Sequence, residues 1–213
     1  MLTVKSFVFS PVQENTYIVF NENKNAIIFD PGCYFTEEQR TLGAFISDNN
    51  LKVTKLINTH CHLDHVFGNR WVHQNYKQEL FIHAEEEKML AMAPTSGINW
   101  GLTFDNYTGP LHFIEEGETI SIDNDTFTVL LTPGHSPGSL SFYCKEDGFV
   151  ISGDVLFKGS IGRTDLPFGN FEILYNSIHQ KLFTLPDKTI VYSGHGEPTT
   201  IGVEKRSNPY VKA

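Results

Sequence analysis

The densest group of side chains able to do chemistry is the hexad His60-Cys61-His62-Leu63-Asp64-His65, which places three imidazoles and one carboxylate within six residues. Imidazole nitrogens and carboxylate oxygens together suit Zn²⁺ and would also accept iron or manganese. In an extended loop His60 and His62 point the same way, whereas Asp64 and His65, beyond a turn, face a neighbouring point. Crowding several imidazoles without a cation is costly. The hexad therefore predicts a metal site, and its layout suits two metals better than one.

Three further candidate ligands follow β-rich runs, as the hexad itself follows the run KLINT. The run TVLLTPG precedes His135, FVISG precedes Asp154 and TIVYSG precedes His195. In layered α/β proteins the crevice beyond the strand ends binds ligands, because loops there present side chains on a rigid platform. We therefore expect seven side chains to converge on one metal centre: His60, His62, Asp64, His65, His135, Asp154 and His195.

Other polar residues have plainer interpretations. Asp154 taken alone is equally compatible with an Asx turn after its strand. Asp30, before Pro31-Gly32, either caps a turn or orients a ligand histidine from outside the metal shell. Cys61 is expected to be neither nucleophile nor ligand, so its substitution should be tolerated. The remaining histidines are interpreted as hydrogen-bonded structural residues: His73, His83, His112 and His179.

Local patterns predict the elements that position these residues. In the first half we expect strands at 3–9, 15–20, 26–30, 53–59 and 80–83, and helices at 37–48, 66–76 and 84–92. The stretch Thr36-Glu37-Glu38-Gln39 has the form of a capping box for the first helix. Segment 94–112 is expected to be irregular, and its aromatic residues either form a wall over the site or pack on the surface.

The second half is expected to contain strands at 118–122, 126–131, 139–144, 148–152 and 189–193, with a loop at 153–169 and a short helix after 200. Asn170 is a plausible N-cap for a helix whose apolar stripe runs from Phe171 to Leu182 and ends before Pro186. In the loop, Arg163 and Asp165 either contact substrate or pair with each other, and we favour a structural role. Two groups of strands, each accompanied by one-faced helices, predict an α/β fold: a four-layer αββα sandwich with two mixed sheets face to face and helices outside, forming one domain over residues 1–213.

Composition narrows the class of function. Sixteen Lys and Arg against 25 Asp and Glu give a net charge of −9, which argues against nucleic acid as a partner. The N-terminus lacks the apolar run of a signal peptide, and no stretch is long and apolar enough to span a membrane, so we expect a cytoplasmic protein with no membrane partner. The three cysteines form no Cys-x-x-Cys pair and are expected to be free thiols. The oligomeric state is left open.

The ordered set of seven ligands resembles that of the metallo-β-lactamase superfamily over nearly the whole chain. The stretches TPGHSPGS at 132–139 and GSIGRTDLP at 159–167 are similar to the glyoxalase II-related branch, notably its short, single-domain members. The resemblance does not extend to the C-terminal helical domain with which glyoxalase II proper holds glutathione. It implies that Asp154 bridges two metals and that Asp64 and Asp154 carry the catalytic role. The other implied ligands are His60, His62 and His135 for the first metal, and Asp64, His65 and His195 for the second.

This resemblance implies a metal-dependent hydrolase with two Zn²⁺ per chain, iron or manganese being alternatives. Its substrate would be a small-molecule thioester of the hydroxyacyl-glutathione type, or a related ester, attacked by a metal-bound hydroxide. A second possibility is a sulfur (persulfide) dioxygenase with one iron held by residues matching His60, His135 and Asp154. A third is a non-catalytic metal-binding module. Metal stoichiometry, thioesterase activity and oxygen uptake distinguish the three.

Overall fold

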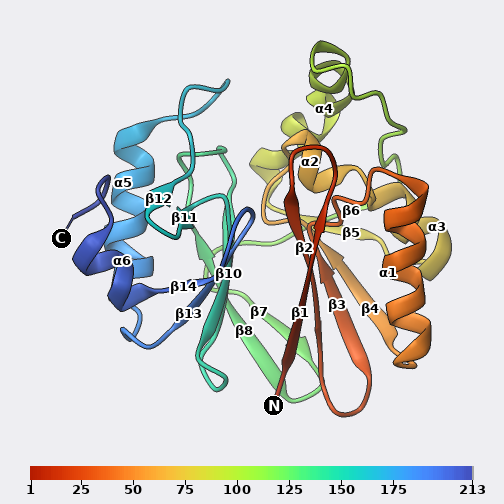
Figure 1. Cartoon of the computed structure of the whole chain (residues 1–213), viewed down its shortest axis with the longest axis horizontal. Coiled ribbons are helices and arrows are strands. Elements are labelled where there is room, and N and C mark those ends of the chain that lie inside the picture. The colour runs from red at the N-terminus through yellow and green to blue at the C-terminus, as the bar shows by residue number, and fades with distance from the viewer. Residues whose placement is uncertain (213) are drawn as a thin grey trace.

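The computed structural model describes residues 1–212, in which two six-stranded sheets pack face to face (Figure 1). The first sheet has the order β1-β2-β3-β4-β5-β6. β1, β2 and β3 pair antiparallel with one another, whereas β3, β4, β5 and β6 pair parallel, so the sheet is mixed. The strands are β1 (Thr3–Phe9), β2 (Glu14–Phe20), β3 (Asn25–Phe29), β4 (Lys52–Ile57), β5 (Leu80–Ile82) and β6 (Leu111–Phe113).

The second sheet has the order β14-β13-β10-β9-β8-β7 and is also mixed, because only β10 and β13 run parallel. A small hairpin of β11 (Leu156–Phe157) and β12 (Ser160–Ile161) follows β10. The strands of the second sheet are β7 (Thr119–Ile122), β8 (Asp125–Leu131), β9 (Leu140–Cys144), β10 (Phe149–Gly153), β13 (Ile190–Ser193) and β14 (Thr199–Thr200).

Strand alternation explains the layers. On β3, Ile27 and Phe29 pack into the core between the sheets, whereas Ile28 packs into a separate core on the outer face. Phe29 meets Phe142 of the other sheet with ring centroids 5.1 Å apart. On β10, Ile151 faces the inner core and Val150 faces a third core. Both sheets are therefore apolar on both faces, which requires a covering layer on each outer side.

Helices supply those covering layers, so the predicted four-layer αββα architecture is confirmed (Figure 1). Outside the first sheet lie α1 (Thr36–Asp48), α2 (Leu63–Val66), α3 (Asn69–Tyr76), the 3₁₀ turn η1 (Ala84–Glu86) and α4 (Glu87–Asn99). Outside the second sheet lie α5 (Phe171–Gln180), η2 (Leu182–Thr184) and α6 (Ile201–Ser207). None of the helices formed by residues 1–212 has the length and apolar character needed to cross a bilayer.

The helix expected at 84–92 is longer than predicted, and the irregular segment expected from residue 94 begins later. After the η1 turn, α4 continues through Pro94 to Asn99. Proline lacks the N–H that would bond the carbonyl four residues earlier. Here the carbonyl oxygen of Leu90 instead accepts a hydrogen bond from Asn106 Nδ2 at 2.8 Å. The side chain of a distant residue thus replaces the missing helix bond, which explains why the local pattern gave the wrong boundary.

Two predicted helix starts also differ in the structure. Phe35, not Thr36, is the N-cap of α1, and the Glu38 carboxylate accepts hydrogen bonds from the backbone N–H groups of Tyr34 and Phe35 at 2.8 and 2.9 Å. The helix expected at 66–76 is two helices, α2 and α3, separated at Phe67 and Gly68. A Cβ at Gly68 would lie 2.4 Å from the Cys33 sulfur, so close packing there requires glycine.

The N-cap of α5 is as predicted, since Asn170 Oδ1 accepts from Ile173 N at 3.1 Å. The helix itself is shorter than expected, because α5 ends at Gln180. Leu174, Ile178 and Leu182 are all fully buried in one core, as the predicted stripe requires, whereas Phe171 is 44% exposed. The buried part of the helix packs against Val150 and Val191 in the outer core of the second sheet.

Candidate metal centre

The seven predicted ligands come together where the loops after β4, β8, β10 and β13 meet. The hexad begins three residues after the end of β4, and α2 begins within it. His135 lies in the turn between β8 and β9, Asp154 directly follows β10, and His195 lies two residues after β13. Strands from both sheets therefore contribute, and the centre lies across one end of the sandwich.

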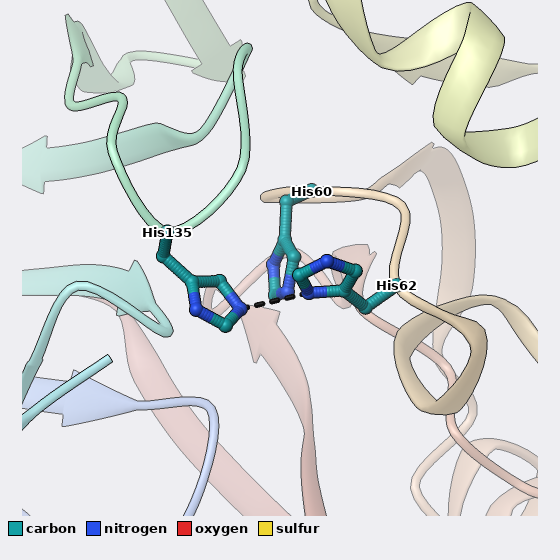
Figure 2. A group of neighbouring side chains, drawn as sticks. All are labelled: His60, His62 and His135. Carbon is teal, nitrogen blue, oxygen red and sulfur yellow. Dashed lines mark hydrogen bonds between the residues drawn. The ribbon is translucent and has the colours of Figure 1, made fainter. Parts of the chain in front are cut away.

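His60, His62 and His135 form the three-histidine cluster, in which one ligand atom from each ring lies within 4.8 Å of the others (Figure 2). The ring of His60 lies edge-on to both neighbours, with centroid distances of 4.8 Å to His62 and 4.9 Å to His135. His62 Nδ1 and His135 Nε2 face each other at 2.8 Å. Three ring nitrogens thus point at a common centre from two separate loops.

Asp64, His65 and His195 form a second group, the Asp64 cluster, with the same close spacing. His195 Nε2 lies 3.1 Å from Asp64 Oδ2, and His65 Nε2 lies 3.7 Å from the same oxygen. Asp154 stands between the two clusters. Its Oδ2 is 3.5 Å from His135 Nε2 and its Oδ1 is 3.5 Å from His65 Nε2. The geometry places one carboxylate where it faces both groups.

The outer nitrogen of most rings is held by a hydrogen-bond partner, which fixes the direction of the inner one. His65 Nδ1 lies 3.0 Å from Asp30 Oδ2, His135 Nδ1 lies 2.7 Å from the Arg163 carbonyl, and His195 Nδ1 lies 3.1 Å from the Gln13 carbonyl. At His135 the carbonyl oxygen accepts the Nδ1–H of a neutral imidazole, which leaves Nε2 as a lone pair directed inward. Asp30 faces His65 Nδ1 and so orients a predicted ligand histidine, which is one of the two roles that the sequence suggested for it.

Buried polar atoms without partners test whether a metal fits. Within the described chain, the inward atoms His60 Nε2, His65 Nε2 and Asp154 Oδ1 have no hydrogen-bond partner although they are shielded from solvent. Unsatisfied buried polar groups each cost about 1–3 kcal/mol. Cations coordinated by these atoms would remove that cost, and nitrogen with carboxylate oxygen is a donor set suited to Zn²⁺ or iron. The residues present therefore fit divalent metals.

Protonation favours the same conclusion for the three-histidine cluster and Asp154. Burial, followed by the nearby His135, lowers the pKa of His62 to about 3, and burial with three neighbouring imidazoles lowers the pKa of His60 well below its usual value. Burial alone would raise the pKa of Asp154, but the facing His65 and other imidazoles hold it well below its usual range. At neutral pH the three-histidine cluster is therefore uncharged and Asp154 is ionised, which is the protonation that metal ligation requires. At His65 and His195, burial alone would lower the pKa, but the facing carboxylates of Asp64 and Asp154 raise it, and bound cations would take over this pairing with the carboxylates.

A glycine keeps the two clusters close. A Cβ at Gly194 would lie 2.1 Å from Asp154 Oδ1 and 2.7 Å from His65 Cε1. No side chain can therefore occupy this position without displacing the carboxylate that faces both clusters. This explains physically why glycine precedes His195.

A pocket of about 250 Å³ opens beside the three-histidine cluster. One wall is α4 with the segment after it, including Met92, Trp100 and Leu102, and the opposite wall is the loop containing Leu166. Trp100 therefore takes the wall position considered for segment 94–112, whereas Tyr107 packs into the core outside the first sheet. Arg163 and Asp165 pair with each other at 2.7 Å, the structural interpretation of the two, although Arg163 also lines the pocket.

The four histidines interpreted as structural lie outside both clusters and form local hydrogen bonds. His73 Nδ1 bonds the Gln78 carbonyl, His179 Nδ1 bonds the Tyr175 carbonyl, and His112 bonds Glu79. His83 caps η1 by accepting from Glu85 N.

Two residues that support the centre were missed by sequence reasoning. Asn15 Nδ2 donates to the carbonyls of Ser193 and Gly196 at 2.9 and 2.8 Å, which fixes the loop of His195. Glu86 accepts hydrogen bonds from residues beside His60 and His135. Both contacts join residues distant in the sequence, so no local pattern singles them out.

Comparison with known proteins agrees with this geometry. A match to the family described as Metallo-beta-lactamase superfamily covers residues 9–195. The chain is 39% identical over 202 residues to "Probable metallo-hydrolase YqgX" of Bacillus subtilis, covering 94% of this chain and 93% of the relative. It is 39% identical over 203 residues to "Hydroxyacylglutathione hydrolase GloC" of Haemophilus influenzae, covering 94% of each.

Solved structures give the same result. The BLEG-1 B3 metallo-beta-lactamase superposes with a TM-score of 0.91 at 36% identity, over 99% of this chain and all of that one. A di-iron-bound form of TTHA1623 superposes with a TM-score of 0.87 at 34% identity, over 97% of this chain and 100% of that one. The chain therefore belongs to the metallo-beta-lactamase superfamily.

Proposed function

We propose that the protein is a metal-dependent hydrolase that cleaves a thioester of the hydroxyacyl-glutathione type, or a related ester, at a centre of two divalent cations. The observation that carries the proposal is the inward convergence of the three-histidine cluster and the Asp64 cluster on either side of Asp154. Similarity to a hydroxyacylglutathione hydrolase supports the substrate class. The di-iron-bound neighbour supports two cations per chain, with zinc as our first expectation and iron as the alternative.

The residues of the chain have separate tasks in this reaction. Divalent cations at such a centre lower the pKa of bound water from about 15.7 to about 7 and polarise a carbonyl. Asp154, ionised and facing both clusters, holds the two halves of the centre in one geometry. Trp100 and Leu166 line the pocket beside the centre, where they would contact the parts of the substrate next to the scissile bond. They also exclude water from one side of the pocket.

No protein nucleophile is needed, and Cys61 is poorly suited to be one. Its side chain is 1% exposed, and burial, together with the charge of Glu86, raises the pKa of its thiol well above the usual value. The thiolate is the reactive form of cysteine. Cys61 is therefore a poor nucleophile at neutral pH, and we assign the attack to water activated at the metal centre.

The test combines metal content with two activity assays. Protein purified without added metal is analysed for its elements, then assayed for hydrolysis of a hydroxyacyl-glutathione thioester and for oxygen uptake with glutathione persulfide. We expect two metal ions per chain and thioester hydrolysis. The variant His135→Ala should lose activity by more than the roughly 10–100-fold that removal of an outer hydrogen-bond partner causes.

The matched control is His112→Ala, which removes a half-exposed imidazole paired with Glu79 and should retain full activity. One iron per chain with oxygen uptake would replace the hydrolase proposal by the persulfide dioxygenase. Inactivity in both assays with metal bound would favour a non-catalytic metal-binding module.

A further inference from the structure

Glu86 is the buried member of three consecutive glutamates. Glu85 and Glu87 are exposed, whereas Glu86 is 0% exposed. Among residues 1–212 no lysine, arginine or histidine forms an ion pair with it. Burying a carboxylate without a cationic partner is costly unless hydrogen bonds compensate. The burial of Glu86, at the junction of η1 and α4, therefore has to be compensated by hydrogen bonds.

Hydrogen bonds to two separate loops give that reason. Glu86 Oε2 accepts from the backbone N–H of Cys61 at 2.7 Å. Glu86 Oε1 accepts from the backbone N–H of Gly138 at 2.7 Å and from Ser136 Oγ at 2.5 Å. Cys61 lies between His60 and His62, and Ser136 directly follows His135. One carboxylate thus links the two loops that carry the three-histidine cluster.

The chemistry of the partners requires an acceptor on both oxygens. Backbone N–H groups can only donate, and one of them reaches each oxygen of Glu86. A glutamine side chain has the same shape but would present its NH₂ group to one of these donors. One loop would then lose its acceptor while the volume of the side chain stayed the same.

We propose that Glu86 is a positioning residue of the metal centre: its carboxylate fixes the hexad loop relative to the loop of His135 and thereby sets the affinity of the three-histidine cluster for a cation. Glu86 does not itself contact the cation or substrate. The inference rests on the proposed function only in that this cluster holds a divalent metal. It goes beyond that function by assigning the affinity to a residue outside the ligand set.

The experiment compares Glu86→Gln with Glu85→Gln in the full chain, the same substitution at adjacent positions. Zinc affinity of the metal-free proteins is measured by competition with a chelator, and the visible spectrum of the cobalt-loaded proteins reports ligand geometry. We expect Glu86→Gln to bind zinc about 10–100-fold more weakly and to show an altered cobalt spectrum, as for other outer partners of metal ligands. Glu85→Gln should match the wild type in both measurements.

A second variant keeps the test decisive if Glu86→Gln does not fold. Ser136→Ala removes one of the three hydrogen bonds and leaves both backbone contacts, so zinc affinity should fall roughly 2- to 10-fold. Unchanged affinity and cobalt spectrum, in Glu86→Gln or in Ser136→Ala where only that variant folds, would overturn the inference even if thermal stability fell. If the wild type bound no zinc or cobalt, the metal-centre proposal would fail together with it.

Discussion

The imidazoles of the centre are held through one nitrogen so that the other remains free. Asp30 holds His65 in this way, and the carbonyls of Arg163 and Gln13 hold His135 and His195. His62 is the exception, because its Nδ1 faces the cluster. Lowered pKa values keep the buried rings of the three-histidine cluster neutral. The cluster is therefore uncharged at neutral pH, so a cation would not have to compete with an imidazolium proton for its rings.

At Cys61 the backbone N–H supports the metal centre, whereas the thiol has no role in it. Its N–H donates to Glu86, but its thiol is buried and its pKa is raised by burial. We expect Cys61→Ala, which keeps the N–H, to retain metal content and turnover while losing about 1 kcal/mol of stability from the small cavity. Elemental analysis, initial rates and thermal unfolding measure these effects, with Cys144→Ala as the control buried cysteine. A Cys61→Ala protein that lost its metal would instead make the thiol a ligand.

Among the elements, strand ends were predictable because their signals are local. β-rich runs located β4, β8, β10 and β13, and residues shortly after them form the centre. The extent of α4 was not predictable, since the carbonyl freed by Pro94 is satisfied by Asn106. The role of Glu86 was also not predictable, because nothing in the local sequence distinguishes it from Glu85 and Glu87, and only the fold buries it. Sequence reasoning therefore located the candidate ligands and offered Asp30 as an orienting partner, but it missed the long-range contacts of Asn15 and Glu86.

The extension of α4 matters for substrate binding, because it brings Trp100 to the pocket wall. Trp100→Ala removes apolar contact that the ground state and transition state share, so KM should rise with kcat nearly unchanged. Loss of about 1–2 kcal/mol of apolar contact corresponds to roughly a 5- to 30-fold rise. Ile98→Ala is the matched control, because Ile98 is 67% exposed near the end of the same helix and does not line the pocket. Steady-state kinetics on the thioester distinguish the two variants, and equal KM values would refute the wall assignment.

In the whole molecule, the metal centre occupies one end of the sandwich and a polar clasp joins the sheets at the other (Figure 1). Asp123, in the turn between β7 and β8, accepts hydrogen bonds from three asparagines in and beside the β2–β3 turn: Asn21, Asn23 and Asn25. The two sheets are thus connected at both ends, by the clasp at one and by the ligands at the other.

The clasp predicts a pH-dependent stability that is separate from the metal centre. The hydrogen bonds from Asn23, Asn25 and Asn21 lower the pKa of Asp123 from 3.8 to about 2. A carboxyl whose pKa is lowered by folding stabilises the folded state above its unfolded pKa and loses this contribution as pH falls towards the folded value. Asp123→Asn keeps a residue that tolerates the left-handed backbone at φ 53° but cannot ionise.

Metal-free wild type and Asp123→Asn should therefore differ in urea unfolding midpoint at about pH 6, with the wild type more stable, and the difference should shrink as the pH falls below about 4 towards the folded pKa of about 2. Because the carboxylate is exposed, added salt should narrow the difference at the higher pH. Asp48→Asn, at an exposed aspartate outside the clasp, is the control and should change the unfolding midpoint little at either pH. A constant gap between wild type and Asp123→Asn across this range would mean that packing of the turn, rather than the charge of Asp123, holds the two sheets together at that end.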